Sequence, residues 1–129
     1  MEHTIEFGGE LKAVTVTTSG RADRSGFFRF IEEIVSDPRF LPGMAMLIDH
    51  SALDASSLTS LDVKVIGELT GSLTDRLGAS PAAVVVPDSL LFGLTRMGEA
   101  HVGPTQLRVG IFYSREEAIA WLRDAVGEE

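Results

Sequence analysis

Two short apolar runs constrain the fold of this 129-residue chain more than any other feature. Residues 82–86 read Ala-Ala-Val-Val-Val between Pro81 and Pro87, and residues 44–48 read Met-Ala-Met-Leu-Ile before Asp49. A strand with one wet face alternates apolar and polar residues, whereas a strand of a parallel sheet is covered on both faces and loses that alternation. We therefore expect both runs to be buried strands of a mostly parallel sheet covered by helices.

Segments with helical spacing separate these runs. Residues 27–35 place apolar side chains at offsets of three, four, seven and eight, so they line one face of a helix that ends before Pro38. Further helices are predicted over residues 59–77, closed by Gly78, over residues 89–100, and from Ser114 onward. The predicted cap residues are Thr59 with Asp62, Asp88, and Ser114 with Glu117. The last helix is expected to bury Ala118, Ile119, Leu122, Ala125 and Val126, with Trp121 packing at its edge.

The remaining segments complete the sheet. Residues 4–7 and 11–19 have the pattern of strands, and Gly8-Gly9-Glu10 between them indicates a tight hairpin turn. Residues 106–112 are expected to form the last strand, and residues 49–57 a polar loop. The order β-β-α-β-α-β-α-β-α predicts an α/β fold with an open, mostly parallel sheet and an antiparallel N-terminal edge hairpin, in a single domain over residues 1–129.

Composition and charge argue against several function classes. A net charge of −8 disfavours binding to nucleic acid or to an anionic membrane, because both surfaces repel an acidic protein. The chain has no cysteine, which excludes disulfides, cysteine-ligated metals and thiol catalysis. The N-terminal residues lack the basic start and apolar run of a signal peptide, and no apolar stretch has the length of a membrane span. These features favour a cytoplasmic protein that contacts neither nucleic acid nor membrane.

Acidic residues follow two predicted strands at the edge where parallel strands end, which is where ligands bind in such sheets. Asp49 and Asp88 could together bind Mg²⁺ or act as acid and base, but a turn at Asp49 and a helix cap at Asp88 explain both residues without chemistry. His50 is adjacent to Asp49, yet neighbours on an extended segment point to opposite sides and do not form a relay. No Gly-x-Ser-x-Gly, Gly-x-Gly-x-x-Gly or Walker sequence is present. We therefore expect no catalytic residue, no metal and no cofactor.

Several segments are similar to those of the STAS-like domains, in particular the SpoIIAA-like branch, which takes its name from an anti-sigma-factor antagonist. The carrying segments are Ser19-Gly20-Arg21, Met46-Leu47-Ile48-Asp49, Ala83-Val84-Val85-Val86, and residues 111–122 with Glu117-Ala118 and Trp121-Leu122. The last segment is the most specific of these, and together they span nearly the whole chain. The resemblance implies a non-enzymatic fold used for protein contacts or for ligand sensing.

The resemblance also implies a phosphorylation switch at a serine in an Asp-Ser-x-Gly-like motif that opens a helix. The matching stretch here reads Asp54-Ala55-Ser56-Ser57-Leu58, so Ala55 stands at the phosphoacceptor position and Ser57 replaces the glycine. Ser56 and Ser57 remain candidate acceptors, because a helix N-terminus favours phosphate. A simpler interpretation is that this cluster of serine and threonine residues only caps the helix.

Two functional hypotheses follow. The first is a regulatory module that acts through contacts with a protein partner or as a homodimer. The second is a sensor that holds a small apolar ligand between its helices and its sheet. The candidate contact residues are Phe28, Asp49, His50, Asp54, Asp88, Leu91 and Phe92. An exposed surface at Phe28, Leu91 and Phe92 without a cavity would favour the first hypothesis, and a closed apolar pocket would favour the second.

Overall fold

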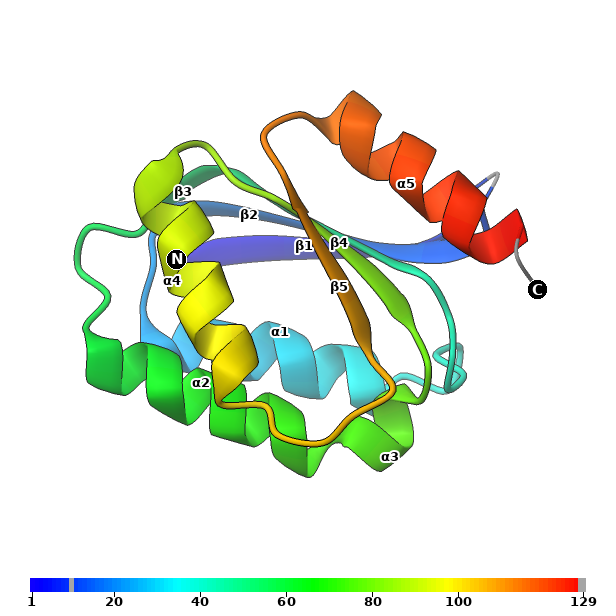
Figure 1. The fold of residues 1–129 in the computed structure, drawn as a ribbon, viewed down its shortest axis with the longest axis horizontal. Helices are drawn as coiled ribbons and strands as arrows, with labels where there is room; N and C mark the ends of the chain where they lie inside the picture. The colour runs from blue at the N-terminus through cyan, green and yellow to red at the C-terminus, as the bar shows by residue number, and fades with distance from the viewer. Residues whose placement is uncertain (10, 128–129) are drawn as a thin grey trace.

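A computed structural model describes residues 1–9 and 11–127 of the chain. Within these residues, five strands form one sheet in the order β1-β2-β3-β4-β5 (Figure 1). The strands are β1 (Glu2–Gly8), β2 (Ala13–Arg21), β3 (Met46–Asp54), β4 (Pro81–Val85) and β5 (Arg108–Phe112). The first pair is antiparallel and every later pair is parallel. The expected α/β fold, with its mostly parallel sheet and antiparallel edge hairpin, is confirmed.

Helices cover both faces of the sheet, as a parallel sheet requires. The helices are α1 (Arg24–Ser36), α2 (Ser60–Ser72), α3 (Thr74–Leu77), α4 (Ser89–Ala100) and α5 (Arg115–Gly127). Helices α1 and α2 lie on one side of the sheet and α5 lies on the other (Figure 1). The core on the α5 side is made largely of small residues, with Ala13, Ala83 and Ala118 packed around Leu47 and Leu122. The core on the other side is larger and combines residues of α1, α2 and α4 with residues of all five strands.

The N-terminal hairpin closes as expected between Gly8 and Lys12. Gly8 and Gly9 have φ of 115° and 79°, which glycine adopts without a steric penalty, and the Lys12 N–H donates to the Gly9 carbonyl over 3.2 Å. The third residue of the predicted turn, Glu10, lies outside the described residues. Strand β2 then continues through Arg21, two residues beyond the end expected at Ser19. Pairing of these residues with the extended β3 keeps the strand going.

Strand β3 runs to Asp54, and the polar loop expected over residues 49–57 is therefore wrong for residues 49–54. The apolar run predicts only the part of the strand that is covered on both faces. Between Thr17 and Ser19 of β2, the partner register on β3 advances from Asp49 to Ala52, so β3 carries one extra residue there. Such a bulge changes which side chains face the core, and it hides the continuing strand from a period-two pattern.

The predicted helix caps form as expected at the starts of α2, α4 and α5. The Leu91 N–H donates to the Asp88 carboxylate over 3.0 Å, and the Glu117 N–H donates to the Ser114 hydroxyl over 3.1 Å. The single helix expected over residues 59–77 is instead divided into α2 and α3 at Leu73. Gly78 ends α3 with a φ of 67°, as predicted. In α5, Val126 is exposed rather than buried, whereas Trp121 packs on Phe112 as expected.

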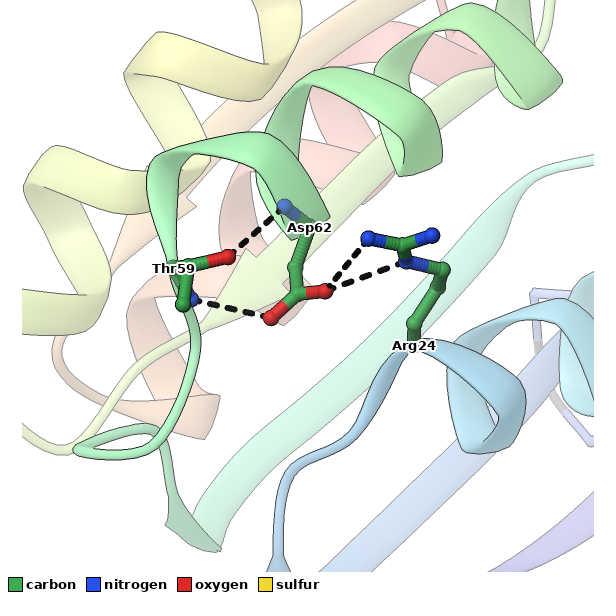
Figure 2. A network of polar contacts seen from close by, with 3 residues as sticks. All are labelled: Arg24, Thr59 and Asp62. Atoms are coloured by element: carbon green, nitrogen blue, oxygen red, sulfur yellow. Dashed lines mark hydrogen bonds and ion pairs between the residues drawn. The ribbon is translucent and has the colours of Figure 1, made fainter.

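The capping box of α2 also ties that helix to α1 (Figure 2). The Asp62 N–H donates to the Thr59 hydroxyl over 3.1 Å, and the Thr59 N–H donates back to the Asp62 carboxylate over 3.0 Å. The other oxygen of that carboxylate accepts from Arg24 of α1 at 3.0 and 2.9 Å. The hydrogen bonds from Thr59 and the Arg24 guanidinium hold the pKa of Asp62 below its ordinary value. One carboxylate thus fixes the relative position of the first turns of α1 and α2.

Helix α2 meets α4 with almost no side chain between the two backbones. A Cβ atom on Gly67 of α2 would lie 2.5 Å from the Gly98 carbonyl oxygen of α4 and 2.8 Å from the His101 Cβ atom. Both distances are shorter than a carbon atom tolerates, so only glycine permits this crossing at Gly67. The closest backbone neighbours of α2 are α1 and α4 rather than a strand. Helix α2 is therefore supported by these two helices and not by the sheet.

We expect Gly67→Ala to lower the free energy of unfolding by about 1–3 kcal/mol, because the new methyl group forces the two helices apart. The matched control is Gly93→Ala in α4, where a Cβ atom would meet nothing within 4 Å. In that exposed helix position alanine should stabilise the protein by about 1 kcal/mol. Urea denaturation of the two variants provides the measurement. An equal gain of stability in both variants would contradict the close crossing.

Candidate functional site

A cavity of about 180 Å³ lies between the sheet and helices α1, α2 and α4. Its floor consists of strand residues whose side chains point to this face of the sheet, namely Met46, Ile48, Ala82, Val84 and Val109. Its walls come from the apolar stripes of the three helices, namely Phe27, Phe30, Ile34, Val63, Ile66, Leu91 and Leu94. The cavity exists because α2 is held by its neighbouring helices, and Ala82 is too short to fill the gap from below.

The polar side chains on the cavity wall are almost all already bonded to neighbouring groups. The Thr70 hydroxyl donates to the Ile66 carbonyl over 3.0 Å, and the Thr95 hydroxyl donates to the Leu91 carbonyl over 2.7 Å. Both bonds stay within the turn of the helix that carries the threonine, and they use the single proton of each hydroxyl. Glu99 pairs with Arg96 at 3.4 Å. The wall is therefore effectively apolar except at His50.

His50 lies on the cavity floor at the bulge of β3. Its side chain is buried, with 4 % of its surface exposed, and its ring packs against the rings of Phe27 and Phe30 with centroids 5.4 and 6.1 Å away. Its Nδ1 atom is 2.7 Å from the hydroxyl of buried Thr18 on β2. Burial lowers the pKa of His50 to about 4, against a smaller opposite effect of the Asp49 charge. His50 is therefore neutral at physiological pH.

Asp49 points to the opposite face of the sheet from His50, as expected for adjacent strand residues. It is buried rather than placed in a turn, which corrects the role expected for it. Its carboxylate accepts from the Ser51 N–H at 2.9 Å and from the Ser51 hydroxyl at 2.6 Å, and it lies 3.6 Å from the Arg115 guanidinium of α5. Asp49 therefore links β3 to the start of α5, and it takes no part in the cavity.

The structure does not bring the candidate residues Asp49, Asp54 and Asp88 together into one site. Asp88 caps α4 as expected, and the Asp54 carboxylate accepts from the Ser56 N–H over 2.9 Å. That hydrogen bond, together with the Ser56 hydroxyl, holds the pKa of Asp54 below its ordinary value. Across residues 1–9 and 11–127, no group of three His, Asp or Glu side chains is placed to hold a metal ion.

The other candidate residues fall into three environments. Ser56 and Ser57 are exposed in the loop that leads into α2, where both are accessible to a modifying enzyme. Phe28 is half-buried at the boundary of the core, and Phe92 is half-buried, with its ring stacked on that of Tyr113 at 5.5 Å. Leu91 is buried in the cavity wall and is not a surface residue.

Comparison of the structure with solved structures identifies a close architectural match. An uncharacterized protein of the DUF3478 family from Shewanella loihica PV-4, whose crystal structure is described as having a SpoIIAA-like fold, superposes with a TM-score of 0.58. The match covers 94 % of this chain and 92 % of that one, at 18 % sequence identity. The chain has a SpoIIAA-like fold. The resemblance inferred from the sequence is confirmed for the fold.

Sequence comparisons add nothing to this structural match. No family model matches the chain, and no curated protein matches its sequence. Among the helices of the described residues, none is long and apolar enough to cross a bilayer.

Sequence reasoning raised a pocket between the helices and the sheet as one of two hypotheses, but it missed where the cavity lies and which residues line it. A pattern of apolar residues gives the face that a helix buries but not the volume left between buried faces. The available signals were small residues on facing elements, Gly67 and Gly98 in two helices and Ala82 in a strand. A further signal was His50, in a stretch that continues a buried strand; the sequence made it a candidate contact residue but did not place it at a cavity.

The buried neutral His50 predicts a specific loss of stability at low pH. The unfolded chain binds a proton at His50 near pH 6.5, whereas the folded protein resists protonation down to about pH 4. Because the unfolded state binds more protons across this window, stability falls as the pH falls from about 6.5 to about 4. Between about pH 7.5 and about pH 5 this contribution amounts to about 2 kcal/mol.

The measurement is urea denaturation at several pH values for the wild-type protein and for His50→Leu. The wild-type protein should lose about 2 kcal/mol more than the variant between about pH 7.5 and about pH 5. The carboxylates whose pKa values are lowered, including Asp54 and Asp62, act at lower pH and are shared by both proteins. Equal pH dependence in the two proteins would show that His50 is not buried in the neutral form.

Proposed function

We propose that this protein is a non-enzymatic binding module that takes up a small apolar molecule in the cavity beneath α2. The observation that carries the proposal is the cavity itself, about 180 Å³ in volume and lined almost wholly by apolar side chains. Ligand sites in proteins are typically concave and apolar with a few polar groups that orient the ligand. An apolar cavity of about 150 Å³ accommodates benzene, which sets the scale of the ligand.

The energetics favour an occupant. A cavity in a protein core is destabilising by about 24 cal/mol per Å³, because the lining atoms lose contacts that a packed core would provide. An apolar molecule of matching size restores those contacts and leaves water at the same time. The walls need no rearrangement to receive it, so little of the binding free energy is lost in ordering side chains.

The position of Leu91 favours ligand binding over the protein-contact hypothesis. An exposed surface at Phe28, Leu91 and Phe92 without a cavity would have favoured that hypothesis. Leu91 is instead 3 % exposed and lines the cavity, while Phe28 and Phe92 are each half-buried. Helix α4 carries apolar residues on two faces. One face lines the cavity, and the other is exposed to solvent.

The test compares two alanines on opposite faces of β4. Ala82→Leu adds a side chain into the cavity, so it should abolish binding of toluene while changing the free energy of unfolding by less than about 1 kcal/mol. Ala83→Leu adds the same group on the other face, where Ala83 is fully buried in the core under α5. It should destabilise the protein by about 1–3 kcal/mol but leave toluene binding to the folded protein intact.

Toluene binding is measured by chemical-shift changes of the cavity methyl groups, and native mass spectrometry of the purified protein reports any ligand retained from the cell. Failure of the wild-type protein to bind toluene would refute the proposal. Equal toluene affinity of wild type and Ala82→Leu would place the binding site elsewhere.

A second candidate function rests on the outer face of α4. Leu90 and Met97 are 49 % and 40 % exposed, and Gly93 between them is also exposed, so one helix face presents an apolar stripe. This stripe fits a protein contact, of which a homodimer through two α4 helices is the simplest form.

For a homodimer, the double variant Leu90→Lys with Met97→Lys should be monomeric by light scattering at concentrations where the wild type is dimeric. Leu61→Lys is the matched control, because Leu61 is 60 % exposed on α2, and it should leave the dimer intact. A wild-type protein that is monomeric at all concentrations would remove the homodimer from consideration.

A further inference from the structure

Nε2 of His50 is a polar atom beside the cavity that makes no hydrogen bond to the described residues around it. Thr70, Thr95 and Glu99 all have partners within α2 or α4. His50 contributes its Nδ1 side to Thr18, and Nε2 makes no hydrogen bond to any residue in the described part of the chain. His50 is nonetheless buried, with 4 % of its surface exposed to solvent, and its ring borders the cavity. Every fully buried side-chain nitrogen or oxygen atom of the described residues has a hydrogen-bond partner, so Nε2 is an unused polar atom that keeps some accessible surface beside the cavity.

The hydrogen bonds around Thr18 indicate which ring nitrogen carries the proton. The Thr18 hydroxyl has one proton, and it donates to the Asp49 carbonyl at 3.3 Å. Both contacts can be hydrogen bonds at the same time only if His50 donates from Nδ1 to the Thr18 oxygen, over 2.7 Å, and this arrangement places the proton of the neutral ring on Nδ1. Nε2 is left with an unshared lone pair, and because Thr18 holds the Nδ1 side, the Nε2 side is the one that remains for the cavity.

We propose that Nε2 of His50 accepts a hydrogen bond from the hydroxyl group of the ligand, and that the site is therefore specific for a small apolar alcohol or phenol. This inference rests on the proposed function, since it names the class of molecule that the cavity takes. A hydroxyl donates to a neutral imidazole without placing a charge in the cavity. The remainder of the molecule must be apolar, because the other polar groups of the wall are already bonded.

Charged molecules of the same size fit the site poorly. A carboxylate would need a protonated His50, and burial lowers the pKa of this ring to about 4. An ammonium group would need an anion in the cavity, and Glu99 is occupied by Arg96. Burial of an unpaired charge is far more costly than burial of a hydroxyl that makes one hydrogen bond.

The test uses phenol and toluene, which have the same shape and differ in the hydroxyl. Affinities of both are measured by calorimetry or chemical-shift titration for the wild-type protein and for His50→Leu. In the wild type the hydroxyl finds its acceptor, and in the variant it is buried without one. The ratio of phenol affinity to toluene affinity should therefore fall at least about tenfold in the variant.

The outcomes separate this inference from the proposed function. If the wild type binds neither molecule, the proposed function itself fails. If it binds toluene but the phenol-to-toluene ratio is the same in both proteins, the cavity binds apolar molecules and the role of His50 is overturned.

A second measurement does not depend on the folding of the variant. In wild-type protein with ¹⁵N-labelled histidine, Nε2 of His50 should resonate as an unprotonated nitrogen and should shift on addition of phenol but not of toluene. A protonated Nε2 in the free protein, or the same response to both molecules, would overturn the assignment.

Discussion

The backbone contact between α2 and α4 at Gly67 is the constraint on which the cavity depends. Because the two helices meet without side chains between them, α2 is held by α4 on one side and by α1 on the other. The ion pair of Arg24 with Asp62 fixes the α1 side at the first turn of α2. Because α2 is held by a helix on each side, it cannot pack closer to the sheet. The positions of the helices, and not those of the strands, therefore set the volume of the cavity.

The two faces of the sheet show the effect of this support. On the α5 side a single helix packs directly on small strand residues, and Ala83, Ala118 and Leu122 are fully buried. On the other side three helices share a wider area, and Ala82 faces a cavity. Adjacent alanines of one strand therefore experience opposite environments. We therefore place a function that needs an interior space on the face of the sheet that carries the cavity.

Pattern and propensity were sufficient for most of the fold because they act locally. The runs at residues 44–48 and 82–86 gave two buried strands, and the caps at Thr59, Asp88 and Ser114 gave the starts of three helices. They failed where a tertiary contact overrides the local pattern. Strand β3 continues to Asp54 through a bulge that changes the facing of its side chains, and this change cannot be seen without the partner strand. For the same reason Asp49 was expected in a turn, although β2 and β4 hold it within the sheet.

The order of strands and helices, the parallel character of the sheet, and the opposite orientations of Asp49 and His50 can all be predicted from the amino-acid sequence. All three follow from chain periodicity and from the way parallel strands must be connected. The packing of the folded chain was needed to show that His50 borders a cavity and that Leu91 lines it rather than faces solvent. Empty volume and the partners of a buried polar atom depend on how distant segments pack. A one-dimensional pattern records which faces are buried but not how closely they meet.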